Sequence, residues 1–200
     1  MPLSAPAERQ HLHTRRVTCQ GYRRADGLWD IEGHITDQKT YPFENTWRGA
    51  LQPGDLLHEM WIRLTLDDTL TVRAVEAVTD HAPFRGCPAI TPNFQRLVGL
   101  RVASGWTQAV KDRLGGTEGC THLVELLGPV ATTAFQTIGP IVSREQEQKR
   151  RAAEAAGAAP RPRPRPPVLD TCHVMDSAGP LVKEWYPEFY TGPKDAAAGD

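Results

Sequence analysis

The sequence predicts an α+β fold, in which an antiparallel sheet of about four strands is followed by three helices that pack on one of its faces. Apolar and polar residues alternate over much of the region between residues 10 and 80, and a period of two is typical of strands with one buried face. After residue 90 the apolar residues recur every three or four positions, which is typical of helices. From residue 143 the chain becomes polar and rich in proline, so a single domain is expected over residues 1–142.

Four strands are expected in the first part of the chain. Residues 11–22, 29–36 and 60–67 are predicted to form the first three, and the fourth is expected to start at Leu70 after a polar turn. Residues 41–55 contain two prolines and two glycines, which favour a loop between the second and third strands.

Three helices are expected after the sheet. Thr91 and Pro92 are residue types preferred at an N-cap and at the first helical position, so a helix is expected to begin there. A second helix is expected over residues 106–114, where two glycines follow. The third is expected to begin near Thr121 and to pack an apolar stripe on the sheet, and Pro129 should kink it.

The rest of the chain reads as a linker and a docking segment. Residues 143–167 are polar and end in alternating proline and arginine, which predicts a solvated spacer. Residues 168–191 are again apolar and aromatic, so we expect them to dock on the domain or on a second subunit, which would make a homodimer. Residues 192–200 are expected to be disordered.

Composition argues against several classes of protein. The formal net charge is −1, which gives no electrostatic argument for nucleic-acid binding. No apolar run reaches the roughly 18–20 residues of a membrane helix, and the N-terminus lacks the apolar core of a secretory signal. We therefore expect a cytoplasmic protein with reduced cysteines and no nucleotide cofactor, because no glycine-rich nucleotide-binding motif occurs.

The candidate site centres on the expected start of the third helix. Cys120 lies where free backbone amides stabilise a thiolate. His122 and Glu125 are three residues apart, so they share a helix face and can bind a metal or form a base with its orienting carboxylate. A buried structural cysteine and an exposed polar pair are the alternative interpretations.

Upstream residues extend this site. Cys87 occupies a turn between the last strand and the first helix, where ligands are common. His58 has the parity of the core-facing residues of its strand, so it needs a polar partner. His34 lies on the polar face of its strand, so an ordinary solvated position is the competing interpretation. The catalytic candidates are thus His122, Glu125, His34 and His58, and the metal candidates so far are Cys87, Cys120 and His122. Less promising candidates are His11, His13, Cys19, Cys172 and His173.

Several long motifs occur together in order, namely Arg15 with residues 21–37, His58–Met60, Gly119–Glu125, Ala134–Ile138 and, near the C-terminus, LDTCH and EWYP. Through these motifs the chain resembles the bacterial domain-of-unknown-function family 2889 over about residues 9–142. The resemblance implies a link to aromatic catabolism, with a lyase that releases formaldehyde from lignin-derived diaryl compounds.

A fainter similarity is one of layout. A strand meander, a cysteine turn and a later cysteine at a helix start resemble the NifU- and SufU-like scaffolds, which hold zinc or an iron–sulfur cluster with three cysteines and an Asp or His. A third cysteine is missing from the strand region here, and Asp37 or His34 would have to replace it. This similarity adds Asp37 to the metal candidates and implies zinc or iron as the cofactor.

The lyase and two alternatives make different demands. A lyase would use His122 or Glu125 as the base and a metal or His34 to steady a phenolate, with Trp29, Trp61 and Tyr22 lining the site for a small aromatic substrate. A metal or sulfur scaffold would need both Cys87 and Cys120. An interaction module would need residues 168–190 instead.

Overall fold

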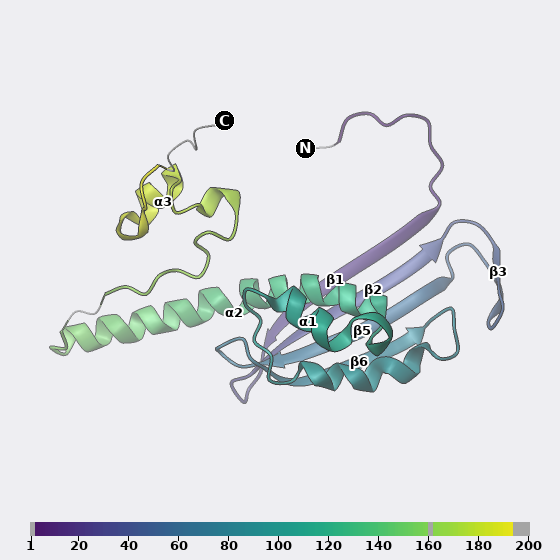
Figure 1. Ribbon diagram of the computed structural model, residues 1–200, viewed down its shortest axis with the longest axis horizontal. Helices are drawn as coiled ribbons and strands as arrows, with labels where there is room; N and C mark the ends of the chain where they lie inside the picture. Colours follow the sequence, from purple (N-terminus) through teal and green to yellow (C-terminus); the bar gives the residue numbers. More distant parts are fainter. Residues whose placement is uncertain (1–2, 160–161, 194–200) are drawn as a thin grey trace. The chain divides into compact units, whose positions relative to one another are not determined.

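The structure is a computed structural model that describes residues 3–159 and 162–193 (Figure 1). The chain forms two compact units, Met1–Lys149 and Arg150–Asp200. The first unit contains the predicted sheet and the helices that follow it, so the predicted α+β class is confirmed. No helix among the described residues is both long enough and apolar enough to cross a membrane.

The sheet of the first unit is antiparallel, and its four strands lie in the order β1-β2-β5-β6. These strands are β1 (His13–Arg23), β2 (Trp29–Lys39), β5 (Leu56–Leu66) and β6 (Val72–His81). The predicted loop over residues 41–55 contains a small hairpin, with β3 (Phe43–Asn45) and β4 (Gly49–Leu51). Its turn forms because the Asn45 side chain accepts the backbone N–H groups of Trp47 and Arg48.

The period of two in the sequence becomes the two faces of this sheet. Trp29, Ile31 and Ile35 of β2 are buried against the helices, whereas Glu32 and His34 lie on the opposite face. Strand β5 alternates in the same way, so Met60 faces the core. Burying one complete face stabilises the sheet and fixes its register, because a slip of one residue would turn that face outwards.

The helical layer begins with two elements on one side of the sheet (Figure 1). The first predicted helix is a 3-10 segment, η1 (Cys87–Leu97), and it begins at Cys87 rather than after Thr91. Pro92 lies inside this segment and lacks the N–H group that an α-helix would need there. The second is the α-helix α1 (Trp106–Leu114), which ends before Gly115 as expected. A short 3-10 turn, η2 (Gly116–Glu118), leads to the third.

The third helix, α2 (Thr121–Ala155), is much longer than its apolar stripe. It continues through Pro129 and Pro140, and it also includes residues 143–155, which the sequence had assigned to the linker. Seven residues of α2 bury their side chains, namely Leu123, Leu126, Leu127, Val130, Ala131, Ala134 and Ile138. These contacts compensate for the hydrogen bonds that the prolines cannot make.

The second unit contains η3 (His173–Met175), α3 (Pro180–Trp185) and η4 (Pro187–Phe189). Leu169 and Val182 are buried, so this segment has a small core. Trp185 is 57% exposed. Residues 194–200 of the predicted disordered tail lie outside the described residues.

Candidate metal centre

One end of the sheet gathers polar side chains on its core-facing side. Because the strands are antiparallel, the first residues of β1 and β5 meet the last residues of β2. The register places Asp37 opposite both Arg15 and His58. The first turn of α2, with His122, lies over the same end.

Asp37 is the centre of this arrangement, and it is 0% exposed. Arg15 binds it through two bonds, with Nε donating to Oδ1 and Nη2 donating to Oδ2, each at 2.8 Å. The ring nitrogens His13 Nε2 and His58 Nδ1 lie 2.9 Å from Oδ1 and Oδ2, respectively. Burial alone would raise the pKa of Asp37, but the bonds from Arg15 and His13 outweigh it and hold the pKa at about 2. Asp37 is therefore a carboxylate at any physiological pH.

His58 and His122 lie face to face, with ring centroids 3.8 Å apart and ring planes inclined by 33°. Burial lowers the pKa of both rings, and the charge of the neighbouring His122 lowers the pKa of His58 further. Arg15 has the same effect on the pKa of His122. Both rings are thus neutral near pH 7, which is the form that binds a metal or accepts a proton.

Asp37, His58 and His122 each offer one ligand atom, and these atoms lie within 4.8 Å of one another. We call them the Asp–His–His group. Asp37 Oδ2 lies 2.9 Å from His58 Nδ1 and 4.0 Å from His122 Nε2. Two atoms that each bind a zinc ion at about 2.0–2.1 Å can lie no more than about 4.2 Å apart, so side-chain shifts of well under 1 Å would suffice. The donor set suits zinc or ferrous iron and leaves coordination positions for a substrate.

Cys120 contacts the His122 ring of this group. Its Sγ lies 3.9 Å from His122 Nδ1, on the edge of the ring that faces away from Asp37. A proton on Nδ1 that points to the sulfur leaves the lone pair of Nε2 directed at Asp37 and His58. Cys120 therefore touches His122 without belonging to the Asp–His–His group.

Glu125 lies at the solvent side of the same cluster. Its Oε2 accepts a bond of 2.8 Å from Arg15 Nη1, and its side chain is 55% exposed. Arg15 thus connects the buried carboxylate of Asp37 to an accessible one. A group that enters from solvent would meet Glu125 and the outer edge of Arg15 first.

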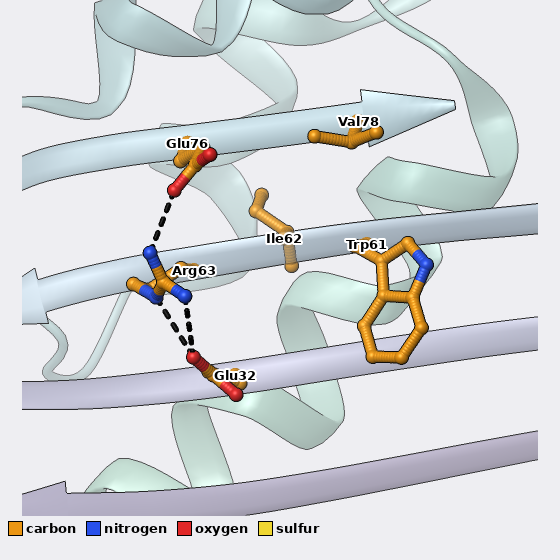
Figure 2. Close-up of a pocket in the computed structure, with 6 residues that line it drawn as sticks. All are labelled: Glu32, Trp61, Ile62, Arg63, Glu76 and Val78. Carbon is orange, nitrogen blue, oxygen red and sulfur yellow. Dashed lines mark hydrogen bonds and ion pairs between the residues drawn. The ribbon is translucent and has the colours of Figure 1, made fainter. Parts of the chain in front are cut away.

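Other predicted site residues lie elsewhere. His34 is on the opposite face of the sheet, where it stacks on Trp61 at 3.5 Å between ring centroids and contacts Glu59. Figure 2 shows Trp61 on this outer face beside Arg63, which is held between Glu32 and Glu76. The sheet therefore separates His34 and Trp61 from the Asp–His–His group.

The remaining predictions also fall outside the group. Trp29 is 1% exposed and belongs to the core, eight residues along β2 from Asp37, or about 27 Å at the usual rise per residue. Tyr22 lies opposite Asp30, at the same distant end of the sheet. Cys87 packs against the core, and among the described residues it does not belong to a metal-capable group.

Sequence reasoning undervalued two residues. The sequence places His13 among the less promising candidates and shows Arg15 only as part of a motif, but both residues bind Asp37. Arg15 has the same parity as Cys19, which packs against the core, so its charged side chain starts on the helix side of the sheet, where an acidic partner is expected. That parity was the available signal.

The fold and the Asp–His–His group together define an α+β protein with a candidate single-metal centre between a sheet end and a helix start. Residues 13–136 match the model of the family described as "Protein of unknown function (DUF2889)", so the chain belongs to this family and the resemblance is confirmed. No curated protein matches, and no solved structure matches. The similarity in layout to NifU- and SufU-like scaffolds has no support among these comparisons.

The two lowered histidine pKa values predict a pH-dependent stability. As the pH falls to the ordinary histidine pKa of about 6.5, these two histidines become protonated in the unfolded chain but stay neutral in the folded chain, because their pKa values are lower there. The unfolded state therefore binds more protons, and the free energy of unfolding falls as the pH decreases from 7.5 to 5.5. Each histidine contributes a slope of at most about 1.4 kcal/mol per pH unit. Urea unfolding of the metal-free protein at both pH values measures this change.

The control for this prediction is His122→Asn, which should reduce the loss of stability between pH 7.5 and 5.5. It removes one of the two rings and also the charge that lowers the pKa of His58. A wild-type stability that rises on acidification over this range would contradict the prediction.

Proposed function

We propose that this protein is a metal-dependent carbon–carbon lyase that releases formaldehyde from lignin-derived diaryl compounds. The observation that supports the proposal is the Asp–His–His group, whose donor atoms lie within 4.8 Å of one another at the start of α2. Two neutral imidazoles and one carboxylate form a three-ligand set, and sets of this kind leave positions open for a substrate.

A bound zinc or iron ion would act as a Lewis acid, which makes a coordinated oxygen more acidic and stabilises negative charge on it. The residues present fit this task. Asp37 supplies the anionic ligand because its pKa of about 2 keeps it ionised, and Arg15 and His13 hold both of its oxygens in place. Second-layer bonds of this kind orient metal ligands and tune their affinity.

The reaction needs no oxidant or reductant. The substrate phenol reacts as its phenolate, whose electron pair opens the benzylic ether to a quinone methide, and the ether oxygen departs with the electron pair of its bond as a second phenolate. A base then takes the proton of the primary hydroxyl, the carbon–carbon bond breaks, and its electron pair flows into the quinone methide while formaldehyde leaves. The products are a diaryl alkene and formaldehyde, and the phenolate takes up the proton.

Glu125 is the residue we assign as the base. It is the most accessible carboxylate of the cluster, and it lies one helical turn from His122 on the same face of α2. Arg15 has five N–H groups on its guanidinium. Within the described part of the chain, two of them bind Asp37 and one binds Glu125. The remaining N–H groups give Arg15 the role of steadying the phenolate, in place of His34.

Glu125→Gln tests this assignment. The variant is expected to lower formaldehyde release from a phenolic diaryl substrate with a hydroxymethyl group by about 100-fold or more, because an amide cannot accept the proton. Metal content, measured by mass spectrometry, should stay at the wild-type level. Glu145→Gln is the matched control, because Glu145 lies on the same helix in a similar ion pair with Arg23.

Two outcomes would overturn the proposal. One is formaldehyde release that survives complete removal of the metal by a chelator. The other is a protein whose bound metal depends on Cys87 and Cys120 but not on Asp37, which would favour the scaffold.

A further inference from the structure

One sulfur atom lies beside the edge of His122 that faces away from Asp37, and a second sulfur atom lies next to the first. Cys120 Sγ is 3.9 Å from His122 Nδ1 and 3.8 Å from the thioether Sδ of Met60. Met60 comes from β5, where it is 1% exposed, and Cys120 immediately precedes α2. We infer that Met60, Cys120 and His122 form a second metal site, specific for a soft monovalent cation such as Cu(I).

The spacing of these three residues, which we call the soft-ligand cluster, suits one shared ion. With metal–sulfur bonds of about 2.3 Å and metal–nitrogen bonds of about 2.0–2.1 Å, the two measured separations correspond to angles of about 110° and 130° at the ion. The first angle is close to the tetrahedral value, and the second is about 10° wider than the trigonal value of 120°. Cys120 Sγ can therefore share one cation with the Met60 sulfur on one side and with the His122 nitrogen on the other.

The donor types favour Cu(I) over the divalent ions that suit the Asp–His–His group. Thiolate and thioether sulfurs are soft ligands that select Cu(I), whereas a carboxylate with two imidazoles suits zinc or iron. Met60 is buried among the core residues, so the cluster lies at the dry inner edge of the site. A soft cation with few ligands requires no water to complete its coordination there.

His122 couples the two sites. A neutral imidazole carries one proton, and a cation on Nδ1 leaves that proton on Nε2, which faces Asp37. Nε2 then donates to the carboxylate and cannot bind a second ion. Occupation of the soft-ligand cluster by Cu(I) should therefore weaken divalent metal binding to the Asp–His–His group, and the cluster would act as a soft-metal inhibitory site.

Anaerobic titration of the full-length protein with Cu(I), against a competing chromophoric chelator, tests the site. The wild type should bind one tight equivalent, Cys120→Ser should lose it, and Met60→Leu should bind at least about 10-fold more weakly. Met60→Leu keeps the volume of the core, so the variant should remain folded, which urea unfolding can verify.

Cysteines outside the cluster are the controls. Cys87 is partly buried and Cys172 is exposed, so their serine variants report on binding by any cysteine. Both should retain the tight equivalent. The inference would be overturned if Cys172→Ser lost Cu(I) binding as completely as Cys120→Ser, or if Met60→Leu bound Cu(I) with the wild-type affinity.

The Cu(I) site does not require the proposed lyase activity, and two variants separate them. Asp37→Asn should lose zinc but keep Cu(I), because Asp37 lies on the other edge of His122. Met60→Leu should keep zinc and become insensitive to displacement of zinc by Cu(I). If Cu(I) binding were lost in Asp37→Asn and kept in Met60→Leu, the cation would be in the Asp–His–His group and the second site would not exist.

Discussion

Asp37→Asn is expected to abolish zinc binding and to lower the free energy of unfolding by about 2–4 kcal/mol. The change keeps the shape of the side chain but removes the charge that compensates Arg15 and that orients His58. The new NH2 group also replaces an oxygen that accepts hydrogen bonds, so its hydrogens must face the donors Arg15 and a histidine, whichever of the two oxygens it replaces. The loss is smaller than for a fully buried pair, since the Arg15 side chain is 36% exposed and can reach water.

Urea unfolding of the metal-free protein measures the stability part of this prediction, and zinc titration measures the metal part. Glu125→Gln is the matched control, because it removes the other carboxylate that Arg15 binds, in an exposed position. It should change stability by less than about 1 kcal/mol. If the two variants were equally stable and both bound zinc like the wild type, Asp37 would be neither a ligand nor the anchor of the cluster.

Gly33→Val is expected to destabilise the protein by about 3 kcal/mol or more, since it adds volume where β2 meets α2. A Cβ atom at position 33 would lie 2.6 Å from Val130 Cγ2 and 3.0 Å from Leu126 Cγ. Both neighbours are fully buried, so neither can move aside into solvent. Helix α2 would have to rise from the sheet, and His122 would move away from Asp37.

Urea unfolding and zinc titration together measure this effect, and both stability and zinc affinity should fall. Gly128→Ala is the control on the helix itself, because nothing lies within 4 Å of a Cβ atom there. It should be neutral or stabilising by up to about 1 kcal/mol. The double variant Gly33→Ala with Val130→Ala should recover much of the stability, and a Gly33→Val protein as stable as the wild type would show that α2 is not seated on Gly33.

Local sequence patterns predicted some strands and helices better than others. The alternation around Trp29 to Thr36 predicted β2 because a period of two leaves few alternatives. The apolar stripe from Leu123 to Ile138 predicted α2, but not its continuation to Ala155, since polar residues after 143 suit a helix and a linker equally well. The first helix was expected to begin after Thr91, but the segment begins at Cys87, so that Pro92 lies inside it, where its missing N–H group favours 3-10 over α-helical geometry.

Parity decided which candidate residues could share a site. His58 was expected on the core face and lies there, whereas His34 belongs to the other face of the same sheet. One residue of offset along a strand is enough to separate two side chains completely. Closeness in the sequence therefore does not show that His58 shares a site with His122 while His34 does not.

By itself, the sequence determined the α+β class, the position of the sheet before the helices, and the helix start at Thr121 that carries His122, because these depend on periodicity and on residue preferences within a few positions. Only the tertiary structure decided that His13, Arg15, His58 and His122 converge on Asp37, and that Cys120 meets Met60 rather than Cys87. Of these contacts, the one between Asp37 and His122 joins residues 85 positions apart in the sequence. Strand register and the close seating of α2 on Gly33 bring them together, and neither is visible in any local pattern.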